Sequence, residues 1–130
     1  VKEEKYDGST FHRTMATFMI QGGKISGSTP SINDEIGTNN HNTNYTVAMA
    51  KANEPNSATS EFFINTADNS KIIYGDGTKF DETYTVFGTV IDGKDVVDAI
   101  AKAPVTADPY SGEMSVPVNP VTIIHATILP

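Results

Sequence analysis

The sequence predicts a mainly β domain, either a barrel or a sandwich. Short runs of β-branched and aromatic residues alternate with turns rich in Gly, Asn and Asp, which is typical of many short strands. Helical patterns are confined to residues 94–102 and a short segment at residues 1–5. A length of 130 residues matches one modest core, so we expect a single domain over residues 1–130.

The N-terminal third contains a strand pair followed by a long loop. Residues 1–5 resemble the tail of a helix, and residues 9–22 predict two short strands joined by a bend near Ala16 and Thr17. Period-two alternation would place Met19 and Gln21 on one face of the second strand, with Phe18 and Ile20 on the other. Residues 24–44 are rich in Ser, Thr, Asn and Gly, and predict a surface loop.

The middle of the chain predicts strands separated by polar connections. Apolar runs at residues 46–50 and 62–66 indicate two strands, and the β-branched run at residues 85–91 indicates a third. Residues 71–84, which contain Gly and Asp around a weak apolar pair, predict a loop.

The C-terminal third contains the one clear helix. Val96, Val97 and Ile100 form a narrow apolar stripe over residues 94–102, and Pro104 ends the pattern. Residues 105–120 predict a loop. The final segment, residues 121–129, is apolar on both faces and predicts a strand between covered surfaces.

Charge and composition exclude several function classes. The formal net charge is −7, from sixteen acidic and nine basic residues, and no Lys or Arg cluster offers a face for nucleic acid. No apolar run approaches the roughly 18 residues of a membrane helix. The chain has no cysteine, its three histidines lack ligand spacing, and its acidic residues do not match a calcium loop. We therefore expect a soluble protein that binds no metal or cofactor, nucleic acid or membrane. The absence of cysteine does not determine the compartment, and the cytoplasm is taken as the default.

Two long sequence blocks resemble the signatures of a known family. The first contains Phe11-His12-Arg13 and Phe18-Met19-Ile20-Gln21-Gly22-Gly23, and the second runs from Met49 to Asn65. Both are similar to the cyclophilin family of peptidyl-prolyl cis-trans isomerases in its bacterial or archaeal form, and residues 86–97 and 120–128 continue the likeness. The resemblance implies a closed eight-stranded antiparallel barrel capped by two helices. The family's first hairpin and helix would precede Val1, so the chain is expected either to be a fragment or to receive those strands from another segment.

The resemblance also implies a site and a reaction. Arg13 would donate a hydrogen bond to the prolyl nitrogen as an X–Pro bond rotates, and apolar residues would hold the proline ring. The implied substrate-binding residues are Phe18, Met19, Gln21, Ala50, Lys51, Ala52, Glu61, Phe63, Ile72 and Tyr84. Partners would be proline-containing peptides or unfolded proteins, whose folding the enzyme would assist without a cofactor.

Three positions depart from the commonest family pattern, and two other functions stay open. Glu61 stands where Gln is often seen, Lys71 where many members carry Trp, and Tyr84 where many eukaryotic members carry His. Glu61 and Lys71 favour an alternative, a proline-peptide binding or chaperone module that does not catalyse rotation. A third interpretation is an inactive fragment that needs a partner to complete its sheet.

Overall fold

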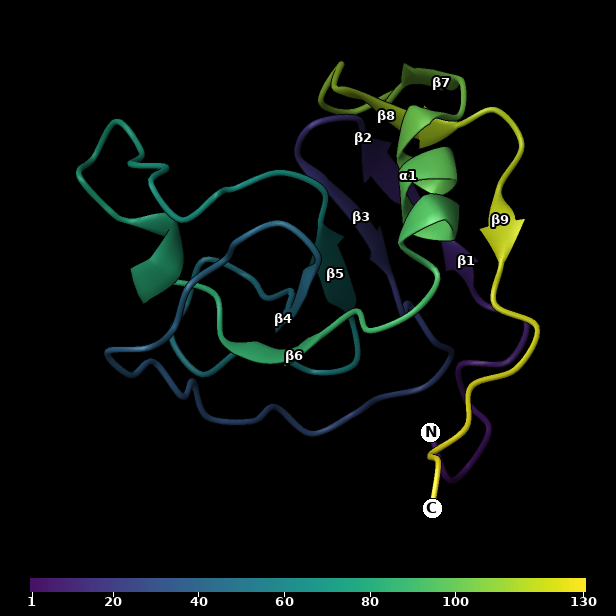
Figure 1. Cartoon of the computed structure of the whole chain (residues 1–130), viewed down its shortest axis with the longest axis horizontal. Coiled ribbons are helices and arrows are strands. Elements are labelled where there is room, and N and C mark those ends of the chain that lie inside the picture. Colours follow the sequence, from purple (N-terminus) through teal and green to yellow (C-terminus); the bar gives the residue numbers. More distant parts are fainter.

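The centre of the molecule is one antiparallel sheet. The structure is a computed structural model that describes all residues, 1–130. Five strands pair in the order β2-β3-β5-β4-β6 (Figure 1). Their bounds are Arg13–Met15 for β2, Met19–Gly22 for β3, Phe62–Asn65 for β5, Thr46–Met49 for β4 and Val86–Thr89 for β6.

Two short antiparallel pairs lie outside the central sheet. Strand β1 (Thr10–Phe11) pairs with β9 (Val121–Thr122), and β7 (Val105–Ala107) pairs with β8 (Met114–Pro117). The mainly β class is confirmed. The hydrogen-bonded strands form three separate sheets, so the closed eight-stranded barrel is not confirmed, and its completion by another segment stays a prediction.

Helix α1 (Lys94–Lys102) has the bounds that the sequence predicts. Gly93 precedes it with φ 81°, a left-handed conformation that glycine adopts without steric cost. Val97 and Ala101 are buried one turn apart, whereas Val96 is 57% exposed. The prediction that Val96 belongs to the buried stripe is wrong, because the helix turns its Val97–Ala101 row to the sheet.

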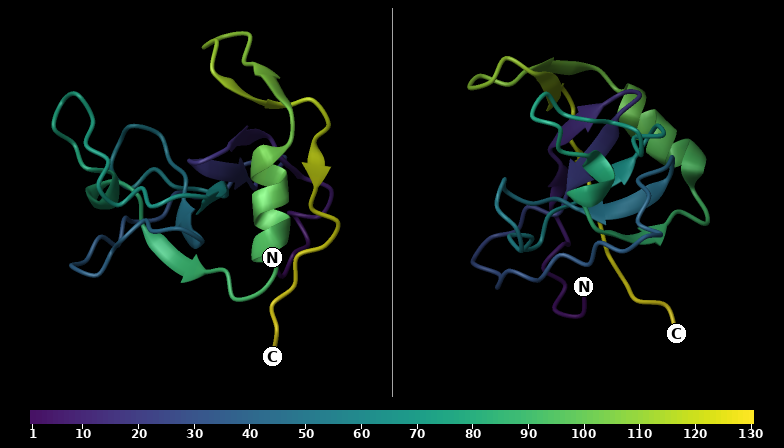
Figure 2. Two further views of the ribbon diagram at one scale, coloured as in Figure 1. Left: turned by 45° about the horizontal axis from the view of Figure 1, so that its top comes forward. Right: turned by 90° about the vertical axis from the view of Figure 1, so that its left-hand side faces the viewer.

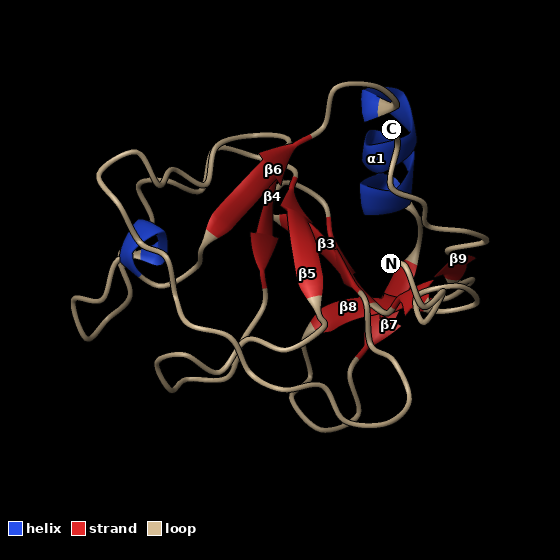
Figure 3. Cartoon of the chain, turned by 90° about the horizontal axis from the view of Figure 1, so that it is seen from below, coloured by secondary structure: helices blue, strands red, loops and turns tan.

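Two small cores lie on opposite faces of the central sheet. Ile20 packs with Val97 and Ala101 of α1, whereas its neighbour Met19 packs with Ala48, Phe63 and Phe80. Phe80 belongs to the short 3₁₀ helix η1 (Phe80–Glu82), which lies on the other side of the molecule from α1 (Figure 3). None of the helices has the length and apolar character needed to cross a membrane.

The hairpin of β2 and β3 explains how Phe18 and Met19 can share a face. The bend predicted near Ala16 and Thr17 is confirmed, and Thr17 has φ 61°. Phe18 lies in this turn, before β3 begins at Met19. Strand alternation therefore does not apply to Phe18, and the predicted opposition of Phe18 and Met19 is wrong.

Three other element predictions are wrong. Residues 1–8 form turns instead of a helix end. Residues 105–120 contain the β7–β8 hairpin, whose buried β8 positions are Ser115 and Pro117, so the strand carries no apolar alternation to detect. In the last segment only Val121–Thr122 forms a strand, paired with β1, and Ile124 and Leu129 are 87% and 80% exposed. The last segment and the N-terminus lie together at one end of the molecule (Figure 2).

Candidate active site

A cavity of about 220 Å³ lies against the Met19 face of the central sheet. Its lining combines aromatic rings with a single guanidinium. The lining residues are Arg13, Phe18, Met19, Gln21, Ala50, Lys51, Phe63, Tyr74, Phe80 and Tyr84.

Strand register brings the polar and apolar parts of the cavity together. Arg13 of β2 lies opposite Gln21 of β3, Gln21 lies opposite Phe63 of β5, and Phe63 lies opposite Ala48 of β4. Directly opposed residues point to the same face of an antiparallel sheet. Arg13, Gln21 and Phe63 therefore form one row across three strands, which explains why residues fifty positions apart meet.

The Arg13 guanidinium is held by a carboxylate from a distant part of the chain. Its Nε donates to Glu113 Oε1 at 2.8 Å, and its Nη2 donates to Glu113 Oε2 at 2.9 Å. These hydrogen bonds from Arg13, more than any other contact, lower the pKa of Glu113 to about 2, and the same pair raises the pKa of Arg13. Both groups are therefore charged at all physiological pH values.

A chain of hydrogen bonds continues from Arg13 along the rim of the cavity. Arg13 Nη1 donates to Gln21 Oε1 at 3.2 Å, and Gln21 Nε2 donates to Glu61 Oε1 at 3.2 Å. His12 Nε2 also contacts Glu61 Oε1, at 2.9 Å. The carboxylate oxygen of Glu61 accepts from the Gln21 amide nitrogen, so the amide oxygen faces Arg13.

The opposite wall of the cavity is aromatic. The centre of the Phe80 ring lies 5.9 Å from the ring centre of Phe18, 5.9 Å from that of Phe63 and 4.7 Å from that of Tyr84. Burial, more than the nearby Tyr84, raises the pKa of Tyr74 to about 12, so this wall also stays uncharged at neutral pH. These edge-on and tilted ring pairs form the apolar side of the cavity, which can hold a small ring.

Buried asparagines support the aromatic wall from behind. Asn69 Nδ2 donates to the Phe18 carbonyl at 2.8 Å and to Asn65 Oδ1 at 2.8 Å. Asn65 Nδ2 donates to Asn42 Oδ1 at 3.0 Å, and Asn42 Nδ2 donates to the Tyr84 carbonyl at 3.2 Å. This asparagine relay (Asn42, Asn65 and Asn69) thus joins the backbones of two cavity-wall residues.

The structure brings most of the predicted site residues to the cavity. Three of them do not line it: Ala52 is exposed, Glu61 accepts a hydrogen bond from Gln21, and Ile72 packs against the core cluster of Met19, Ala48, Phe63 and Phe80. The Ala50 N–H donates to the Glu61 carbonyl at 3.0 Å, so it is not free for a peptide. Lys51 Nζ forms an ion pair with Asp34 Oδ2 at 2.7 Å.

Sequence reasoning missed Glu113, Tyr74 and Phe80. All three lie in segments that predict loops, where no periodicity indicates which side chains point inward. Lys71 is exposed and does not line the cavity, whereas Tyr74 does. No group of three or more His, Asp or Glu side chains lies close enough to hold a metal ion.

The fold and the cavity define a class of protein: a mainly β domain with a half-open aromatic slot and one fixed guanidinium at its edge. A family model described as cyclophilin type peptidyl-prolyl cis-trans isomerase/CLD matches residues 1–128. The chain is 44% identical to peptidyl-prolyl cis-trans isomerase cyp18 of Streptomyces antibioticus, over 99% of this chain and 80% of that protein. It is 42% identical to the peptidyl-prolyl cis-trans isomerase of Acinetobacter baylyi, over 98% of this chain and 69% of that protein.

A solved structure agrees with the fold. A cyclophilin type peptidyl-prolyl cis-trans isomerase of Cryptosporidium parvum, crystallised in the presence of the dipeptide Ala-Pro, has a TM-score of 0.68 at 23% identity. The match covers 93% of this chain and 74% of that one. The chain belongs to the cyclophilin-type peptidyl-prolyl cis-trans isomerase family. Its function is the cis-trans isomerisation of X–Pro peptide bonds.

Proposed function

We propose that the cavity seats the proline ring of a protein substrate and that Arg13 is the catalytic residue. The observation that carries this proposal is one fixed guanidinium beside a slot walled by aromatic rings. The Arg13 Cζ atom lies 6.0 Å from the centre of the Phe18 ring, so charge and apolar surface are adjacent. The Cryptosporidium structure was determined in the presence of the dipeptide Ala-Pro, which supports a proline-containing ligand.

The reaction requires no nucleophile or proton relay. Rotation of an X–Pro bond faces a barrier of about 18–20 kcal/mol, which comes from amide resonance. In the twisted state the prolyl nitrogen loses this resonance and becomes a hydrogen-bond acceptor. A donor aimed at that nitrogen stabilises the twisted state more than the planar one, and so lowers the barrier.

Arg13 has the chemistry of such a donor. A guanidinium has five N–H groups, of which Glu113 and Gln21 together use three, so two remain for a substrate. It stays protonated, and its planar fork fixes the direction of each N–H group. The half-open slot removes the proline ring from water, which strengthens the hydrogen bond to the nitrogen.

The remaining predicted residues would bind the substrate. Phe18, Met19, Phe63 and Tyr84 would contact the proline ring, because rings and a thioether grip a pyrrolidine without polar demands. Gln21 would orient a substrate carbonyl. Backbone groups of Lys51 and Ala52 would pair with the extended chain, as a strand edge does. Substrates would be exposed X–Pro bonds in folding proteins. A cytoplasmic location stays a prediction.

A peptide isomerisation assay tests the role of Arg13. We expect Arg13→Ala to lower kcat/KM by about 100-fold or more, which is the usual loss when an electrostatic donor is removed from an active site. Arg13→Lys should recover little, because an ammonium lacks the fixed fork. Unchanged activity in both variants would disprove the proposed mechanism. Binding of a proline peptide to the wild type without catalysed exchange would instead select the alternative, a binding module.

A further inference from the structure

Glu113 contacts the proposed catalytic residue from a separate part of the fold. It immediately precedes β8, the strand that packs beside β2 and its Arg13 (Figure 1). No other carboxylate forms an ion pair with Arg13. The two residues are 100 positions apart, so the contact exists only once the β7–β8 hairpin is folded against the central sheet.

The geometry of the pair fixes the whole guanidinium. Glu113 accepts from both Nε and Nη2, which occupy one edge of the planar group, and Gln21 accepts from Nη1. Because the group is rigid and planar, holding one edge determines where the free N–H groups of Nη1 and Nη2 point. A flexible arginine would otherwise have to be ordered when each substrate binds, at a cost in side-chain entropy.

The backbone of Glu113 is held by its own turn. The Asp108 N–H donates to the Glu113 carbonyl at 2.8 Å, and the Glu113 N–H donates to Ser111 Oγ at 3.3 Å. Asp108 Oδ1 accepts from the N–H groups of Tyr110 and Ser111, both at 2.9 Å, so the turn is closed from inside. Gly112 has φ 77°, which a residue with a side chain adopts with strain.

We infer that Glu113 is a positioning residue for the isomerisation, which aims the free N–H groups of Arg13 into the proline slot. This inference rests on the proposed role of Arg13. Exposed ion pairs often contribute nothing measurable, but this pair is bidentate and its two side chains are only 36% and 31% exposed. It also borders the cavity, where a displacement of about 1 Å can cost as much as 100-fold in rate.

A double-mutant cycle tests whether Glu113 acts through Arg13. We expect Glu113→Ala to lower kcat about 10-fold while KM changes less than about twofold, because the donor is mis-aimed but the slot is intact. Glu113→Gln, which keeps the shape and one acceptor, should recover part of this loss. Adding Glu113→Ala to Arg13→Ala should cause no further loss beyond about twofold, because the residue acted through Arg13.

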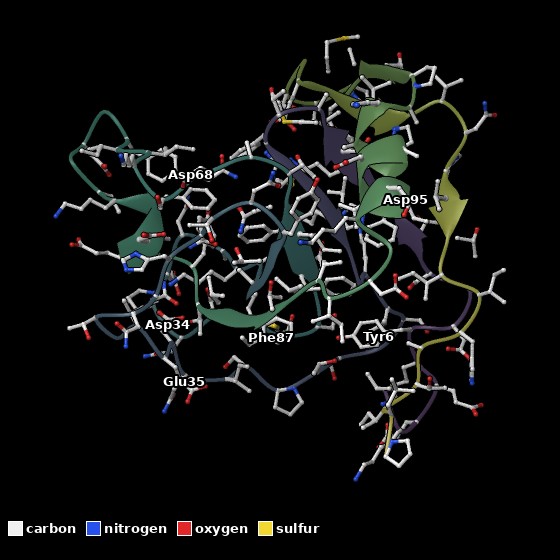
Figure 4. All side chains as sticks on the ribbon, viewed as in Figure 1. Tyr6, Asp34, Glu35, Asp68, Phe87 and Asp95 are labelled. Atoms are coloured by element: carbon white, nitrogen blue, oxygen red, sulfur yellow. The ribbon has the colours of Figure 1, made fainter.

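Two control variants separate positioning from general damage. Tyr110→Ala changes a 98% exposed residue of the same turn, and Glu35→Ala removes a carboxylate from the loop of residues 24–44, outside the cavity (Figure 4). Both should keep wild-type kcat. The Arg13 Nε–H resonance in a ¹H–¹⁵N spectrum should shift or broaden in Glu113→Ala and stay in place in Tyr110→Ala.

The possible outcomes are distinct. Wild-type or higher activity in Glu113→Ala and Glu113→Gln overturns the inference, and higher activity would mean that Glu113 restrains Arg13. An equal loss in the Arg13→Ala background also overturns it, because Glu113 would then act elsewhere. Unchanged activity in Arg13→Ala alone contradicts the proposed function instead. If Glu113→Ala fails to fold, Glu113→Gln and the resonance of Arg13 carry the same test.

Discussion

The two walls of the cavity are built from different interactions. On one side a charged chain, Glu113–Arg13–Gln21–Glu61–His12, runs along the partly exposed rim. On the other side the asparagine relay lies behind the aromatic rings, and Asn42 and Asn65 are 0% exposed. Water screens the charged chain, whereas the asparagine relay is buried away from water.

This difference predicts a division of labour. Partly exposed ion pairs contribute little to the free energy of unfolding but place charge where the reaction needs it. Removing the partner of a buried amide lowers the free energy of unfolding strongly, because its N–H and C=O groups cannot form hydrogen bonds with water instead. We therefore expect changes on the charged wall to affect rate, and changes on the amide wall to affect stability.

The largest effect on stability should come from the asparagine relay. Asn65→Ala leaves Asn42 Oδ1 and one N–H of Asn69 without partners in a site with no water access. We expect the free energy of unfolding to fall by about 3 kcal/mol, measured by urea denaturation. Asn39→Ala, at an exposed position of the long loop, should change it by less than about 0.5 kcal/mol. Equal effects of the two variants would contradict the proposed division.

Acid should have a smaller effect, through Glu113. The pKa of Glu113 is about 2 in the folded protein, against an ordinary value of 4.5, so the unfolded chain takes up the proton first as pH falls. Its contribution to stability is therefore complete above about pH 5 and is lost as pH falls towards 2. Because the side chain is 31% exposed, we expect this contribution to be about 1 kcal/mol.

Comparison with Glu113→Gln isolates this contribution. The difference in the free energy of unfolding between wild type and Glu113→Gln should shrink between pH 5 and pH 3, the range in which the unfolded Glu takes up its proton. A difference that stays constant or grows on acidification would show that Arg13 does not stabilise the ionised carboxylate. Urea denaturation at pH 7, 5 and 3 provides the measurement.

The smallest effect should come from the outer end of the charged chain. Glu61→Gln keeps an oxygen that accepts from Gln21 Nε2 and alters only the partly exposed contact with His12, so kcat/KM should change by less than about twofold. Glu61→Leu, which leaves Gln21 Nε2 without an acceptor, should lower it by about fivefold. If Glu61→Gln proves as harmful as Glu61→Leu, the carboxylate charge itself takes part in the reaction.

Much of the fold could be predicted because its signals are local. The helix at 94–102 and the hairpin around Thr17 follow from periodicity and turn residues that lie close together in the chain. The β7–β8 hairpin could not be predicted, because its buried positions carry Ser115 and Pro117 instead of large apolar residues. The family resemblance predicts that Arg13 and Phe63 share one site, and the strand register explains why their side chains lie close together.

The unpredicted parts of the site depend on contacts between distant segments. Glu113 reaches Arg13 across 100 positions, and Asn42 meets Asn65 across 23. A lone Glu in a turn or an Asn in a polar loop is typical of a solvated surface, so nothing in the sequence marks either as a partner of the cavity. Only the folded sheet and the loops packed against it select these side chains.

The most direct test of the central claim measures peptide binding, cis-trans exchange and stability on wild type and Arg13→Ala. An Ala-Pro-containing peptide is titrated with each protein, and its binding and catalysed cis-trans exchange are followed by NMR. The free energy of unfolding of each protein is measured separately by urea denaturation. We predict that the peptide still binds Arg13→Ala within about fivefold of wild type, that the free energy of unfolding changes by less than about 1 kcal/mol, and that the catalysed exchange rate falls by about 100-fold. Exchange at the wild-type rate in this variant would contradict the claim that Arg13 supplies the rate.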